Sequence, residues 1–449
     1  MKRILAIAWL TCRESVRSGT AVSLLCLALA AVGWLALTLQ GDGTLAGQAE
    51  VFLRYASGAA ISILGLASLW LGAGRIASEV DDRTIQTIVV KPVRTAEIWI
   101  GKWLGLVLVN AALLAAVGCV VVAGVAWILH RSGSRAQQER DDAIRRVMVC
   151  RTPLAPLPGA AGEPGECETR EGDGSHDGDT HRSARIAREV VPPGGSRTWT
   201  FNLPGGSSGG LWLQFAFDYG SAERLPMQGT WSLTRPGSTN ALWAEAVSGL
   251  SAGRHRVEIR QAGKLSGFLT LTFTSAPAQD TGVIVFRPGS SATILLGDSG
   301  MPAQLLRAML IALFKLSVLA AAGLSCSALF TTPVATFAAT SLAVATLCLQ
   351  YFLSIPEGAA TPHSCSTHGD QDDATKAAWY QAAADSVTRA GATVLKPAYS
   401  LDGIGPVSDG LTVPWALVGR AALVLLGGYA LVLAALGIVA LRRREMAGP

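Results

Sequence analysis

The chain is poor in charged residues and carries no motif for nucleotide hydrolysis. Only 15% of its 449 residues are Asp, Glu, Lys or Arg, whereas a soluble domain usually has about 25%. A Gly-x-x-x-x-Gly-Lys-Ser/Thr phosphate loop is absent, so any ATP that drives this protein must be hydrolysed by another chain. The His-Glu-x-x-His zinc helix is also absent, and the apolar stretches lack paired acidic or histidine residues. A membrane enzyme is therefore the least supported class.

Apolar residues are abundant instead, and they are clustered. Six long apolar runs cover about 20–40, 56–75, 103–129, 304–329, 333–354 and 414–441. Each run is long enough to cross the hydrocarbon core of a bilayer, because a helix of roughly 20 residues spans it. The sequence therefore predicts an α-helical polytopic membrane protein with six transmembrane helices.

Lysine and arginine near the ends of these runs predict the orientation. Basic residues gather at 2–17, 75–102 and 442–444, and all three groups lie on the cytoplasmic side if the N-terminus is inside. We therefore predict a multi-pass protein of the bacterial cytoplasmic (inner) membrane with both termini cytoplasmic. The net charge of +5 then reflects topology. No nucleic-acid partner is expected, because the basic residues are not interleaved with aromatic residues in a soluble patch.

The first long polar region changes character along its length. Residues 151–187 are rich in Pro, Gly, Asp and Glu, which is typical of a flexible loop. From about 188 to 296, polar and apolar residues alternate between Gly/Pro turns, as in 197–203 and 268–273. Six or more short strands predict an inserted all-β domain with a sandwich or jelly-roll-like fold outside the membrane. Aromatic residues such as Trp231 are expected to fill its core.

The predicted organisation has seven parts. They are a cytoplasmic amphipathic helix (1–19), membrane helices one to three with a cytoplasmic segment at 76–102 (20–129), an extracytoplasmic helix and flexible loop (130–187), the extracytoplasmic β domain (188–300), membrane helices four and five (301–354), an extracytoplasmic loop (355–413), and membrane helix six with a basic cytoplasmic tail (414–449).

The N-terminal segment predicts a helix on the membrane surface. One face of a helix over 2–18 would carry Ile4, Ile7, Ala8, Thr11 and Ser15, whereas Arg3, Arg13 and Arg17 lie off that face. This separation of small and apolar residues from basic residues is typical of an amphipathic helix. The alternative is a frayed basic tail.

The cysteines permit one disulfide outside the membrane. Cys150, Cys167 and Cys365 fall in the two outer polar regions. Cys150 and Cys167 could form a bridge if the compartment is oxidising, and one thiol is then left over.

Two weaker candidates for chemistry come from isolated residues. His363, Cys365 and His368 are residue types that bind zinc or copper, but one short loop offers few ligands in a fixed geometry, and a polar loop is the alternative. Lys315 interrupts an apolar run and is a candidate for a transport path, because a charge inside a membrane is costly. Snorkelling of Lys315 to the interface is the alternative.

The most informative segment lies between the second and third apolar runs. Residues 75–105 read RIASEVDDRTIQTIVVKPVRTAEIWIGKWLG, so a short basic stretch is held on one membrane face. Such a stretch is too short for a domain and is typical of a docking element for a cytoplasmic partner. Pro92 would end a helix because it lacks a backbone donor, so Thr84–Val90 is expected to form a short helix. The alternative is a basic loop that only satisfies the positive-inside rule.

This segment resembles the type-2 ABC exporter permease family, in the branch described as permeases for multicopper-enzyme maturation. The resemblance is carried by Glu79, Arg83, Thr84, Lys91, Pro92, Arg94, Gly101 and Lys102, in their places between the second and third runs. It implies that these residues form a coupling segment that sits in a groove of a separate ATP-binding cassette ATPase. It also implies that ATP is bound by that partner, with no cofactor on this chain, and that a second copy or a related permease completes the pathway.

The sequence thus favours the membrane subunit of an ABC exporter. The inserted β domain departs from the shortest members of that family, so the resemblance does not identify a substrate. The alternative is a membrane-anchored extracytoplasmic binding or assembly protein, in which the β domain does the work. Six spans are more than an anchor needs.

Overall fold

The structure is a computed structural model that divides into two compact units. The helical unit comprises Met1–Met148 and Gly300–Pro449, and the β unit comprises Val149–Ser299. The structure describes residues 2–39, 45–81, 94–131, 144–145, 147–157, 190–204, 210–219, 227–238, 240–250, 253–259, 266–277, 283–286, 292–354, 386, 389–391, 393, 397–398 and 400–446.

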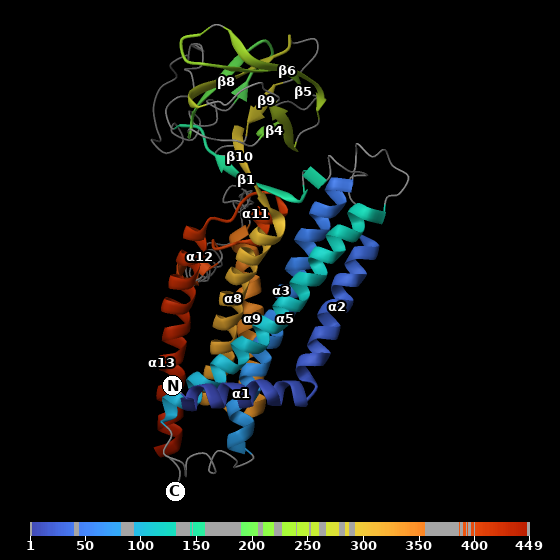
Figure 1. Cartoon of the computed structure of the whole chain (residues 1–449). Helices are drawn as coiled ribbons and strands as arrows, with labels where there is room; N and C mark the ends of the chain where they lie inside the picture. Colours follow the sequence, from blue (N-terminus) through green and yellow to red (C-terminus); the bar gives the residue numbers. More distant parts are fainter. Residues whose placement is uncertain are drawn as a thin grey trace, which may run out of the picture. The chain divides into compact units, whose positions relative to one another are not determined.

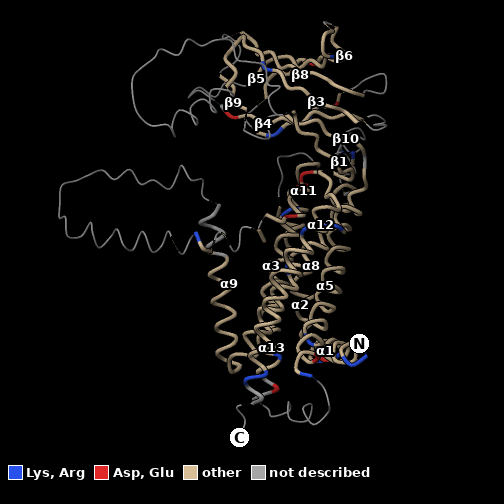
Figure 2. Tube along the Cα trace, turned by 90° about the vertical axis from the view of Figure 1, so that its left-hand side faces the viewer, with Lys and Arg blue, Asp and Glu red and all other residues tan. Residues whose placement is uncertain are grey.

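The helical unit contains the long helices that the apolar runs predict (Figure 1). Its elements are α1 (Lys2–Arg17), α2 (Thr20–Thr38), α3 (Leu45–Asp81), α5 (Thr95–Arg131), α8 (Met301–Leu329), α9 (Thr332–Ser354), α11 (Ile404–Ser408), α12 (Trp415–Ala421), the π-helix η1 (Ala422–Ala430) and α13 (Leu431–Met446). The last three are continuous with one another. Figure 2 shows that Lys, Arg, Asp and Glu lie mainly near the ends of the long helices.

Five helices are long and apolar enough to cross a membrane. They are Thr20–Thr38, Leu45–Ala77, Thr95–His130, Met301–Leu329 and Trp415–Arg443. The sixth predicted run coincides with α9, but its apolar stretch among the described residues covers only Thr332–Thr346. Helix α9 itself runs from Thr332 to Ser354, which is about 34 Å at 1.5 Å per residue. Among the described residues, five of the six predicted spans are thus present as helices with the length and composition to cross a membrane.

Helix α3 is longer than its apolar run. The apolar run begins at about residue 56, whereas α3 begins at Leu45, so Arg54 lies inside the helix. Its guanidinium Nη1 lies 3.7 Å from the Asp409 carboxylate just after α11. The sequence did not reveal this extension, because the first turns of α3 contain few strongly apolar residues.

Glycines bring α3 and α8 into backbone contact. A Cβ atom on Gly72 would lie 2.8 Å from the carbonyl oxygen of Ala320, and one on Gly323 would collide with the carbonyl oxygen of Leu69. Close by, the Ser327 hydroxyl accepts hydrogen bonds from the backbone N–H groups of Ile76 (2.8 Å) and Ala77 (2.7 Å). Small residues permit such close approach of helices in a membrane, so α3 and α8 form a rigid pair.

The β unit is a pair of antiparallel sheets. Its strands are β1 (Val149–Leu154), β2 (Val190–Val191), β3 (Ser196–Leu203), β4 (Leu211–Tyr219), β5 (Met227–Thr234), β6 (Ala241–Leu250), β7 (Gly253–Ile259), β8 (Gly267–Ser275), β9 (Ile284–Phe286) and β10 (Ala292–Gly300). One sheet has the order β1-β10-β4-β9-β2, with β7 also paired to β4, and the other has the order β3-β8-β5-β6. The unit therefore begins at β1, well before the predicted start at residue 188.

Alternating side chains from both sheets share one core, as the period-two pattern predicted. Trp231 is fully buried, and its ring centroid lies 4.9 Å from that of Phe215 on the facing sheet and 4.9 Å from that of Phe273. Gly194 has a φ of 74° in the turn before β3, a conformation that favours glycine. The predicted all-β, sandwich-like domain is confirmed.

Cys150 is a fully buried free thiol on β1, so the structure does not hold the possible bridge to Cys167, which lies outside the described residues. Burial raises the pKa of the Cys150 thiol to about 11. In a variant with Cys150 as its single cysteine, we expect iodoacetamide at pH 9 to alkylate the folded protein far more slowly than the chain unfolded in urea, because the folded thiol is buried and protonated at that pH.

The same pKa difference has a consequence for stability. The folded protein keeps the Cys150 proton between about pH 9 and pH 11, where the unfolded chain releases it, so this thiol lowers the free energy of unfolding as the pH rises through that window. Equal alkylation rates at pH 9 in the folded protein and in urea would show that the thiol is accessible, and would contradict the burial on which both expectations rest.

Candidate functional site

The candidate site lies where α3 ends and α5 begins, next to α1 (Figure 1). We call this region of the helical unit the α1 end. The connecting segment 82–93 lies outside the described residues. This segment holds four of the eight residues that carry the family resemblance, namely Arg83, Thr84, Lys91 and Pro92, as well as the expected helix Thr84–Val90. The other four, Glu79, Arg94, Gly101 and Lys102, are described.

Glu79 and Lys102 form a buried ion pair between α3 and α5. The Lys102 Nζ atom contacts Oε2 of Glu79, and Lys102 is only 4% exposed. An ammonium group buried to this degree requires a charged partner, because its desolvation is costly. The pair therefore ties together the two helices that flank segment 82–93. It also means that Lys102 faces the protein interior.

Arg94 lies at the start of α5 and is exposed. Its backbone N–H donates to Oε2 of Glu97 (3.2 Å), while the N–H of Glu97 donates to the carbonyl oxygen of Arg94 (2.8 Å). A glutamate that reaches back to the residue before the helix satisfies an unpaired donor of the first turn. The cap fixes where α5 begins and presents the Arg94 guanidinium to the surroundings beside segment 82–93.

Gly101 marks the place where α1 packs across α5. A Cβ atom on Gly101 would lie 2.7 Å from Cβ of Ile7, and one on Gly105 would lie 2.7 Å from Cβ of Thr11. The face predicted for α1 is confirmed, because Ala8, Thr11 and Ser15 are its buried residues. This face lies against α5. The Gly-x-x-x-Gly spacing is a signal for such close packing that our sequence analysis did not use.

A second ion pair joins α1 to α3 and was missed at the sequence level. Arg75 Nη1 lies 2.9 Å from Oε2 of Glu14, and Arg75 Nη2 donates to the Ser15 hydroxyl. Arg75 was interpreted only as part of the basic flank of a span. No sequence spacing links Arg75 to partners 60 and 61 positions earlier in the chain. With this pair, α1 is attached to both helices that flank segment 82–93.

The remaining candidates do not join this site. Lys315 lies in the middle of α8, half-buried, and takes part in none of the ion pairs between described residues. His363, Cys365 and His368 lie outside the described residues. In the part of the chain that the structure describes, no group of three or more His, Cys, Asp or Glu residues could hold a metal ion.

Comparison with known proteins adds no relative. No protein-family model matches the chain, and no curated protein gives a significant match. The family resemblance therefore rests on the residues themselves and their placement.

Proposed function

We propose that the chain is the membrane-spanning permease subunit of a type-2 ABC exporter. Separate ATPase subunits dock on segment 76–102 at the α1 end and supply the ATP. A second copy, or a related permease, completes the pathway. In this proposal the protein resides in the bacterial cytoplasmic membrane, with α9 as a sixth span, both termini cytoplasmic and the β unit outside.

The observation that carries the proposal is the Glu79–Lys102 ion pair. Both residues were singled out by the family resemblance, and they meet across the two helices that flank the basic segment. A force applied to residues 82–93 would reach α3 and α5 together, because the ion pair makes their ends move as one. The close contact at Gly72 and Gly323 would then pass the movement to α8. Rigid-body motion of helices is a common means of switching between two states.

The contacts of helix α1 also support the proposed docking of an ATPase on this segment. It is held on α5 through Gly101 and Gly105 and on α3 through Arg75. Three elements around the proposed docking segment are thus linked by close packing and ion pairs. A simple membrane anchor has no need of such linkage between its helices.

A second candidate function is an extracytoplasmic binding or assembly protein that the helices only anchor. The observation that favours it is the β unit, which has its own core of residues from both sheets. Under this alternative, changes at segment 76–102 leave the function intact, and an ATPase is not a partner.

Copurification tests the proposal. The full chain, solubilised in gentle detergent from its native membrane with ATP present, is expected to bring with it an ATPase that carries a phosphate loop. The double charge reversal Arg83→Glu and Arg94→Glu should reduce the recovered ATPase about tenfold or more, because two charged contacts are reversed. Arg443→Glu, an exposed arginine near the end of α13, is the matched control and should leave recovery unchanged.

Two outcomes of this copurification would contradict the proposal. Recovery of envelope proteins with no ATPase, or equal ATPase recovery from the double reversal and from the Arg443→Glu control, would favour the anchored binding protein.

A further inference from the structure

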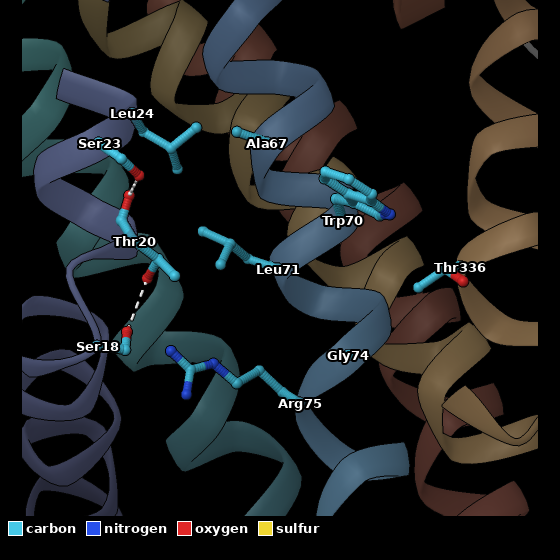
Figure 3. A pocket seen from close by; sticks show the side chains of 10 residues that line it. All are labelled: Ser18, Thr20, Ser23, Leu24, Ala67, Trp70, Leu71, Gly74, Arg75 and Thr336. Carbon is cyan, nitrogen blue, oxygen red and sulfur yellow. Dashed lines mark hydrogen bonds between the residues drawn. The ribbon is translucent and has the colours of Figure 1, made fainter. Parts of the chain in front are cut away.

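A cavity of about 530 Å³ lies between α2, α3 and α9 in the helical unit (Figure 3). Its lining changes along the helix axes. Ser18, Thr20 and Arg75 lie at the end nearer α1, whereas Leu24 and Ala67 lie further along the helices. A cavity that is cationic and rich in hydroxyl groups at one end and apolar at the other fits a molecule with a polar head and an apolar tail.

Arg75 gives the polar end its charge. In Figure 3 its guanidinium points from α3 toward Ser18 and Thr20 on the α2 side. The pair with Glu14 and the bond to Ser15 fix this orientation. A guanidinium group has five N–H donors, so donors remain for a further partner. A fixed arginine beside hydroxyl groups is the arrangement that binds phosphate oxygens in proteins.

The apolar end has the exposure expected of a surface that lipid covers. Trp70 is 64% exposed on α3, and Leu24 and Leu71 are half-buried in the facing walls. Both α2 and α3 are long and apolar enough to cross a membrane. The exposed indole of Trp70 and the two leucines therefore offer apolar surface to an acyl chain.

We propose that this cavity binds one anionic phospholipid of the surrounding membrane. Its phosphate accepts hydrogen bonds from the Arg75 guanidinium and lies beside Ser18 and Thr20, whose hydroxyl groups donate to the Ser15 carbonyl oxygen. An acyl chain lies along Leu24, Leu71 and Trp70. The bound lipid bridges α2 and α3 and, through Arg75, reaches the ion pair that holds α1. Free phosphate would occupy only the polar end and leave the apolar wall uncovered, so the lining favours the lipid. The site does not depend on the proposed ATPase partner.

Native mass spectrometry of the detergent-purified full chain tests this site. Phosphatidylglycerol and phosphatidylcholine with the same acyl chains are added in equal amounts. One phosphatidylglycerol should be retained with about a tenfold preference, because both lipids offer a phosphate to Arg75 but only phosphatidylglycerol carries a net negative charge. Arg75→Gln should reduce its retention about tenfold.

Arg75→Gln also weakens the contact with α1, so a second variant is needed that blocks the cavity and leaves this contact in place. Ser23→Phe fills the cavity from α2 without touching Arg75, and it should reduce retention to a similar extent. Ser62→Phe, an exposed serine of α3 outside the cavity, and Arg17→Gln, an exposed arginine of α1, are the controls and should retain the lipid.

Three results would overturn the proposal. The first is equal retention of the two lipids. The second is phosphatidylglycerol retention that Ser23→Phe leaves unchanged. The third is displacement of the lipid by millimolar inorganic phosphate, which would identify a site for a free anion.

Discussion

Replacing Glu79 with glutamine is expected to lower the free energy of unfolding by about 3 kcal/mol, the lower end of the cost of breaking a buried ion pair. The lower end applies because the Glu79 side chain is 26% exposed, whereas that of Lys102 is only 5% exposed. The cost arises mainly from the Lys102 ammonium, which stays buried after its partner has lost its charge. Denaturant titration of the full chain in detergent measures the change.

Two controls make the result specific to the buried pair. Glu14→Gln breaks an ion pair whose carboxylate is 58% exposed, so its cost should stay within about 1 kcal/mol. The double variant Glu79→Gln with Lys102→Met removes both charges and should recover most of the lost stability, because an apolar pair of similar size is often as stable. Equal effects of Glu79→Gln and Glu14→Gln would contradict the burial argument.

The same pair makes a functional prediction. If it couples segment 82–93 to the helices, the double variant should fold and still lose ATP-driven activity. A double variant that is stable and fully active would show that the pair only stabilises the fold.

Gly72→Ala and Gly323→Ala should each destabilise the helical unit by about 3 kcal/mol, the upper end of the usual cost of overpacking. The added methyl group would meet backbone atoms of the facing helix, which cannot rotate away as a side chain can. The rigid α3–α8 pair must then separate, and the bonds from Ile76 and Ala77 to the Ser327 hydroxyl are lost with it. The melting temperature of the full chain in detergent reports the change.

Gly74→Ala is the matched control for this prediction. It lies two residues from Gly72 on the same helix, and an added Cβ there meets nothing within 4 Å. Alanine is favoured over glycine in a helix interior by about 1 kcal/mol, so this variant should be neutral or stabilising. Similar losses from Gly72→Ala and Gly74→Ala would show that the effect is not due to contact with α8.

Sequence patterns predicted those helices and strands whose own residues show a clear hydrophobic pattern. Long apolar runs located five spans, and alternation with Gly/Pro turns located β3, β4, β5, β7, β8 and β9 but not β6 or β10. The start of α3 at Leu45 and the strand β1 were missed. The first turns of α3 are not strongly apolar, and β1 is recognisable only through its pairing with β10, nearly 150 residues away.

In the candidate site, too, local patterns were predictable from the sequence and tertiary contacts were not. Glu79, Arg94, Gly101 and Lys102 were named from a local motif, and the structure places them around the ends of α3 and α5. Their partnership across those helices, and the Glu14–Arg75 pair, depend on tertiary contacts that no local spacing encodes. The face of α1 was predictable because all its residues belong to one helix with a period of 3.6.

The contact between α3 and α8 also sets an order of events during synthesis. Ile76 and Ser327 are 251 residues apart, and the whole β unit lies between them in the chain. A ribosome that adds about 5–20 residues per second leaves α3 without its neighbour for about 10–50 s. The β unit, whose core draws only on residues within 149–299, can fold within that interval. Until α8 has been made, the Gly72 face of α3 therefore lacks the helix that covers it, and any insertion factor that protects this face must act before α8 leaves the ribosome.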